Sequence, residues 1–70
     1  MLNKILLWSK IARIIVDLSE RLEVTPERAM EIFYESRVND LIRDPDAGLY
    51  LYGDAYIVDE IMRELQAKQG

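Results

Sequence analysis

The sequence predicts an all-α protein, a small bundle of four helices in a single domain over residues 1–70. One long N-terminal helix should be followed by two short middle helices and one C-terminal helix. Residues 3–23 form the longest apolar-periodic run and contain no Gly or Pro. Strong helix-start signals recur later in the chain, and its one strand-like stretch has no second strand to pair with. Half of the 70 residues are apolar, which is typical of a folded domain.

The first predicted helix, from Asn3 to Glu23, carries two apolar seams. The first seam consists of Ile5, Trp8, Ala12, Ile15, Ser19 and Leu22. The second seam consists of Leu7, Ile11, Ile14 and Leu18. Together they cover roughly half of the helix circumference, whereas a helix on a core needs a stripe somewhat wider than about 100°. We therefore expect one seam to contact the rest of the chain and the second seam to contact a partner.

Local signals also place the two middle helices. Residues 25–27, Thr-Pro-Glu, supply a capping hydroxyl, a proline at the first helical position and an early carboxylate. The apolar spacing then continues to about Glu35. We expect Ser36 to cap a short third helix, which the Asp44-Pro45 pair ends because the residue before a proline is pushed out of the helical region.

The last part of the chain contains a strand-like tetrad and then a clear amphipathic pattern. Residues 49–52, Leu-Tyr-Leu-Tyr, have strand propensity, but without a partner strand we expect an extended connector or a helical turn whose side chains fill the core. Asp54 is expected to cap the last helix. Its apolar stripe consists of Ile57, Val58, Ile61, Met62 and Leu65.

The charge balance bears on the classes of partner. Nine basic and thirteen acidic residues give a net charge of -4, so there is no general attraction to phosphate backbones or anionic lipids. We therefore expect neither nucleic acid nor a membrane as a partner. Lys10, Arg13 and Asp17 interrupt the N-terminal apolar run, which argues against a signal peptide and a spanning helix, and we expect a cytoplasmic protein.

The charged residues are also segregated along the sequence. The basic cluster of helix one should lie on its outer side: Lys4, Lys10, Arg13 and Arg21. Acidic residues fall in the later helices, where Asp59, Glu60 and Glu64 should form a solvated acidic face. An acidic face of this kind would complement a partner with a basic rim.

The residue inventory argues against an enzyme. There is no His and no Cys, so the commonest general base and the most nucleophilic side chain are both missing. Counted from Asp44, a calcium loop would need Gly where Leu49 stands and Glu where Ala55 stands. No Gly-rich phosphate loop is present either. We expect no catalytic activity, no metal site and no cofactor.

A resemblance to a known family covers nearly the whole chain. The stretch Asp54–Ile61, preceded by Leu51-Tyr52-Gly53 and by Phe33-Tyr34, resembles an uncharacterised family of short bacterial helical proteins, a domain of unknown function. The similarity lies in core and turn residues. Relatives often carry a His where Tyr52 stands, so a role of that His does not transfer. The genes of this family often lie beside those of ADP-ribosyltransferase-like proteins, which implies an antitoxin-like or accessory partner of a neighbouring enzyme.

We therefore expect a non-catalytic protein–protein interaction module that forms a homodimer through the second seam of helix one. Aromatic and large apolar side chains supply much of the energy at interface centres. The candidate interaction residues are Leu6, Leu7, Trp8, Ile11, Ile14, Leu18, Tyr34, Tyr50, Tyr52 and Tyr56. The alternative is a small helix-turn-helix DNA-binding regulator in which residues 37–43 read the bases. It is disfavoured because Glu27, Glu31 and Glu35 would lie near the phosphates.

Overall fold

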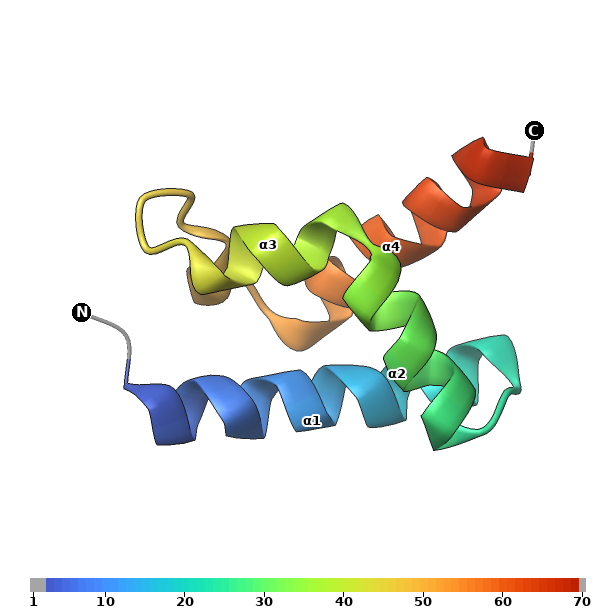
Figure 1. Ribbon diagram of the computed structural model, residues 1–70, viewed down its shortest axis with the longest axis horizontal. Helices are drawn as coiled ribbons and strands as arrows, with labels where there is room; N and C mark the ends of the chain where they lie inside the picture. Colours follow the sequence, from blue (N-terminus) through green and yellow to red (C-terminus); the bar gives the residue numbers. More distant parts are fainter. Residues whose placement is uncertain (1–2, 70) are drawn as a thin grey trace.

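The computed structural model describes residues 3–69, which fold into four α-helices and one short 3₁₀ helix (Figure 1). The elements are α1 (Lys4–Leu22), α2 (Pro26–Glu35), α3 (Arg37–Arg43), η1 (Leu49–Leu51) and α4 (Asp54–Gln69). No strand occurs among these residues. The predicted all-α architecture, with a long first helix and two short middle helices, is confirmed.

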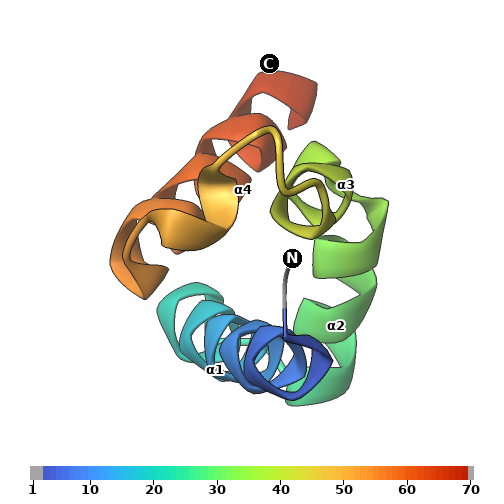
Figure 2. The ribbon, with the colours of Figure 1, turned by 90° about the vertical axis from the view of Figure 1, so that its left-hand side faces the viewer.

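The helices enclose a common core in a body measuring 35 × 22 × 18 Å. α1 runs along one side and packs against both α2 and α4, while α3 packs against α4 and η1. Seen end-on in Figure 2, the helices follow one another around the core in the order α1, α2, α3, α4. α2 and α3 thus form one continuous wall that joins α1 to α4.

Side-chain and backbone caps set the ends of α1 at the predicted residues. The carboxamide oxygen of Asn3 accepts hydrogen bonds from two amides of the first turn, at 2.9 and 3.3 Å. At the other end Glu23 adopts the left-handed conformation, with φ of 57°, and the Val24 amide donates to the Ser19 carbonyl at 3.0 Å. This arrangement is a Schellman motif, which usually has glycine at the position of Glu23.

The break between α2 and α3 is a single residue. Thr25 caps α2 as predicted, its hydroxyl accepting the amide hydrogen of the third following residue at 3.1 Å. Ser36 separates the two helices, but its hydroxyl donates to the Phe33 carbonyl at 2.7 Å and makes no cap. The prediction that its side chain caps α3 is therefore wrong. The Glu64 carboxylate of α4 accepts the Arg37 amide hydrogen at 3.0 Å instead.

The core consists of apolar side chains from all four α-helices. They are Leu7, Ile11, Ile14, Ile15 and Leu18 of α1, Ala29, Ile32 and Phe33 of α2, Val38 and Ile42 of α3, and Ile57, Val58 and Ile61 of α4. The predicted stripe of α4 is confirmed, with Met62 and Leu65 half-buried at its edge. Burial of these side chains is the main source of stability in a chain of this size.

The second seam of α1 is core, so the prediction that it contacts a second copy is wrong. Its four residues are at most 8 % exposed, and Ile14 and Leu18 are fully buried. The seam is buried because α2 and α4 pack against α1 on either side of it. The first seam is divided: Ile15 is buried, whereas Trp8 and Ala12 are exposed. The ten residues of α2 are too few to cover the whole of α1, which has nineteen.

The tetrad at residues 49–52 forms the helical turn that was one of the two predicted alternatives. Leu49 and Tyr50 are half-buried against the core, but Leu51 and Tyr52 are exposed. The prediction that the whole tetrad fills the core is therefore only half right. A single 3₁₀ turn points consecutive side chains in different directions, so it cannot bury all of them.

Glycine at position 23 should stabilise the fold. Glu23→Gly removes the cost of a left-handed conformation for a side chain with a Cβ, so we expect the free energy of unfolding to rise by about 0.5–1 kcal/mol. The matched control is Glu31→Gly in the middle of α2, which should lower it by about 1 kcal/mol. Urea unfolding of both variants measures this. Destabilisation by both substitutions would contradict the assigned end of α1.

Candidate functional site

Lys10 of α1 is the charged side chain held most deeply in the fold. Its ammonium donates to the Tyr52 carbonyl at 2.8 Å and to the Asp54 carboxylate at 3.0 Å, and it lies 5.7 Å from the centroid of the Tyr50 ring. The residue is only 8 % exposed. A buried ammonium is tolerated when acceptors surround it, as they do here. The prediction that Lys10 lies on the outer side of helix one is wrong.

Arg13 and Lys10 share the carboxylate of Asp54. The Arg13 guanidinium donates to the second carboxylate oxygen at 2.8 Å. The hydrogen bond from Arg13, with smaller contributions from Lys10, lowers the pKa of Asp54. The same hydrogen bond raises the pKa of Arg13. Asp54 is thus the first residue of α4 and an anchor for α1, where the sequence predicted a helix cap.

Other charged residues of α1 and α4 are also in ion pairs. Arg21 of α1 pairs with Asp59 of α4 at 2.6 Å, so most of the predicted basic cluster faces α4. Glu60 pairs with Arg63, and Glu64 pairs with Lys68 at 3.2 Å. The predicted acidic face of α4 is therefore largely neutralised by its own neighbours.

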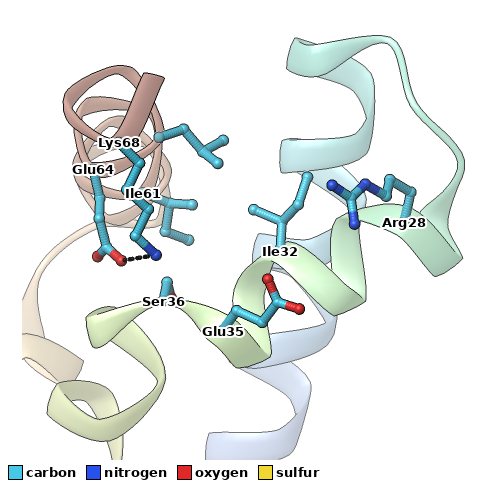
Figure 3. Close-up of a pocket in the computed structure, with 8 residues that line it drawn as sticks. Arg28, Ile32, Glu35, Ser36, Ile61, Glu64 and Lys68 are labelled. Carbon is cyan, nitrogen blue, oxygen red and sulfur yellow. Dashed lines mark ion pairs between the residues drawn. The ribbon is translucent and has the colours of Figure 1, made fainter. Parts of the chain in front are cut away.

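A small hollow between α2 and α4 is not a ligand site. Figure 3 shows it between Ile32 and Ile61, with the Glu64–Lys68 ion pair beside Ser36 and Arg28 on the far side. Its volume is about 70 Å³, whereas pockets for small molecules measure about 300–1,000 Å³. Of the charged side chains at its edge, Glu64 links α4 to α3 through the Arg37 amide, while Lys68 pairs with Glu64 within α4.

The first of two exposed apolar surfaces lies where η1 leads into α4. We call Leu51, Tyr52 and Tyr56 the tyrosine patch. Leu51 is 85 % exposed, and the rings of Tyr52 and Tyr56 stack with their centroids 4.7 Å apart. The Lys10 hydrogen bond to the Tyr52 carbonyl fixes the backbone beneath these side chains. The patch is therefore exposed, and its backbone is anchored to α1 at Tyr52.

The second surface is a groove between α1 and α2. We call it the α1–α2 groove, and its exposed residues are Trp8, Ala12, Val16, Pro26, Met30 and Tyr34. The buried side chains of Ile11 and Ile15 line its floor, and the volume is about 340 Å³. At the α3 end the Arg43 guanidinium lies 4.9 Å from the centroid of the Trp8 ring, a cation–π contact.

The structure divides the ten predicted interaction residues among five environments. Trp8 and Tyr34 meet in the α1–α2 groove, and Tyr52 and Tyr56 meet in the tyrosine patch. Tyr50 is half-buried beside Lys10, and Leu6 is exposed on α1. The four second-seam residues Leu7, Ile11, Ile14 and Leu18 belong to the core, with the edge of Ile11 reaching the groove floor.

Val16, Met30 and Leu51 lie in the two exposed surfaces but were not among the predicted interaction residues. Val16 belongs to neither predicted seam, Met30 lies in the second predicted helix, for which no surface was predicted, and Leu51 was expected to fill the core. The two apolar seams of α1 together cover more of the helix than a single core contact needs, and this did indicate a second surface. The residues that form this second surface depend on how α1 is rotated about its own axis.

Residues 3–69 contain neither a candidate metal site nor a candidate membrane-spanning helix. No group of three His, Cys, Asp or Glu side chains is placed to hold a metal ion. None of the helices described is long and apolar enough to cross a membrane. No protein-family model, curated protein or solved structure matches the chain.

The anchor at Asp54 should make the fold sensitive to acid. Because the folded-state pKa of Asp54 is lowered, its contribution is present above the unfolded pKa of about 3.9 and is lost as pH falls through the folded value. Asp54→Asn should therefore lower the free energy of unfolding at neutral pH and flatten its decline in acid. Urea unfolding between about pH 7 and pH 2.5 measures both effects.

The control for this experiment is Asp46→Asn, which removes the same charge from the exposed turn before η1. It should leave the acid decline unchanged. If Asp54→Asn and the control gave the same decline as the parent chain, Asp54 would not be the anchor described.

Proposed function

We propose that this protein is a non-catalytic protein-interaction module and that the tyrosine patch is its contact surface for a different protein. One observation carries the proposal: an 85 % exposed Leu51 stands beside a stacked Tyr52–Tyr56 pair on a backbone fixed by the buried Lys10. Tyrosine is enriched among the residues that dominate binding energy. Covering a large exposed apolar side chain with a partner removes much apolar surface from water and so contributes favourable free energy to binding.

The Lys10 anchor supports this function because it lowers the entropic cost of binding. A loop that must be ordered on association loses part of the interaction energy. Here the Tyr52 carbonyl is already held at 2.8 Å, and Asp54, two residues further on, is held by two cations. The exposed side chains are thus presented in a defined geometry before a partner arrives.

The partner we propose is a neighbouring enzyme, for which the protein acts as an accessory or antitoxin-like subunit, as the family resemblance implies. The charge distribution favours a partner with a basic rim. Eight carboxylates have no ion pair among residues 3–69: Asp17, Glu20, Glu23, Glu27, Glu35, Asp40, Asp44 and Asp46. Opposite potentials of this kind accelerate association more than they deepen affinity.

The helix-turn-helix alternative receives no support from the geometry. A single residue, Ser36, separates α2 from α3, whereas the motif uses a turn of three or four residues. Of the basic residues on α3, Arg43 lies over the Trp8 ring and donates to Asn39. These contacts hold the Arg43 side chain against the protein and away from a DNA groove.

Substitutions in the tyrosine patch should weaken partner binding strongly without affecting the fold. Leu51→Asp and Tyr52→Ala remove exposed apolar surface, so we expect stability to change by less than about 0.5 kcal/mol and affinity to fall at least about 30-fold. Co-purification with each neighbouring gene product, followed by calorimetric titration, measures this. The control is Leu41→Asp, an exposed leucine on α3. Equal binding by the patch variants and the parent, or substrate turnover by the chain alone, would refute the proposal.

The chain should not bind DNA. Its net charge is -4, and eight of its carboxylates have no ion pair among residues 3–69, so acidic groups outweigh the cations that could release counterions from phosphates. We expect no change in the fluorescence anisotropy of a random duplex at low salt and micromolar protein. Binding that weakens steeply as salt rises would favour the regulator instead.

A further inference from the structure

The outer face of α1 has a shape suited to packing against another helix. Trp8, Ala12 and Val16 follow one another at four-residue intervals, which makes a ridge with a small residue at its centre. The α1–α2 groove lies on one side of this ridge. A second, shallower hollow of about 340 Å³ lies on the other, lined by Ala12, Val16 and three charged residues of α1. Ridges of this spacing pack into grooves of the same spacing on a second helix.

The charges along this face change sign from one end to the other. Lys4 and Arg43 lie near the Trp8 end, while Glu20 and Glu27 lie near the Val16 end. Within residues 3–69 none of the four is in an ion pair. Residues 4 and 20 are equally distant in sequence from residue 12. A helix reversed about Ala12 would therefore bring a basic end against an acidic end at both ends of the contact.

We propose that this face is a homodimer interface in which α1 packs antiparallel against α1 of a second copy, with Ala12 on the two-fold axis. Trp8 of each copy then lies against Val16 of the other, and Lys4 of each copy pairs with Glu20 of the other. A two-fold axis makes every such contact occur twice. Met30 and Tyr34 extend the covered apolar surface onto α2.

Charge complementarity favours a second copy over another occupant. A uniformly basic or acidic partner helix would meet a like charge at one end of the face, and a parallel copy would place like charges together at both ends. Of these arrangements, the antiparallel copy alone matches both ends. The interface consists of α1 and α2 residues, whereas the tyrosine patch lies in η1, the segment after it and α4. The interface therefore leaves the patch uncovered, and this inference stands apart from the proposed function.

The first test is the mass of the full chain by sedimentation equilibrium from about 1 to about 200 μM. We expect the parent to move from monomer to dimer over this range. Ala12→Glu places a charge on the axis and should leave only monomer, whereas Ala67→Glu, an exposed alanine of α4, should dimerise like the parent. A monomeric parent at every concentration, or an Ala12→Glu variant that still dimerises, would overturn the proposal.

Charge reversal tests the antiparallel register. Lys4→Glu and Glu20→Lys should each weaken the dimer about three- to tenfold because two ion pairs are lost, and the double variant should recover the parent affinity. Both substitutions suit the helix dipole, acidic at the start of α1 and basic at its end, so loss of folding cannot account for the effect. A double variant that is weaker than either single one would overturn the register.

The absence of cysteine allows a direct check of the two-fold axis. Ala12→Cys should form a disulfide-linked dimer on mild oxidation, since the two Cβ atoms on the axis come within the range that a disulfide spans. Ala67→Cys should stay monomeric under the same conditions. Equal rates of cross-linking at the two positions would contradict the arrangement, and a dimer captured only through Ala67→Cys would assign the contact to α4 instead.

Discussion

The contact of Lys10 with the Tyr52 carbonyl and the Asp54 carboxylate fixes how α1 is rotated relative to α4. A buried ammonium needs acceptors, so the side of α1 that carries Lys10 must face the start of α4. That orientation turns Ile14 and its seam into the core and leaves Trp8 and its neighbours outside. This orientation leaves the Trp8 side of α1 exposed, and the same contact holds the backbone of the tyrosine patch at Tyr52.

The same contact links stability to function in a small protein. Lys10 donates one of its hydrogen bonds to the carbonyl of Tyr52, the residue that follows the highly exposed Leu51. An apolar side chain in place of Lys10 could make the fold equally stable, because replacing a buried ion pair by packed apolar residues is often neutral or stabilising. The charged anchor is better understood as a way of giving the Tyr52 segment one conformation.

Local signals in the sequence predicted the helices and their ends. Asn3 and Thr25-Pro26 are capping residues, and Asp44-Pro45 is a helix stop, so each end depends on its immediate neighbours. The rotation of α1 could not be predicted in this way. It depends on hydrogen bonds between residues 42 and 44 positions apart, and a lysine on a helix is ordinarily exposed. For the same reason Val16 was missed as a surface residue of α1. Leu51 was missed because a single 3₁₀ turn points consecutive side chains in different directions.

The orientation of α1 can be measured by thiol labelling, because the chain contains no cysteine. Ile14→Cys and Val16→Cys place single thiols two residues apart on the same helix, one fully buried and one half exposed. In dilute solution we expect labelling at position 16 at nearly the rate of an unfolded peptide. Labelling at position 14 should be at least about tenfold slower, because it is limited by opening of the fold. Equal rates, or faster labelling at position 14, would contradict the assigned rotation of α1.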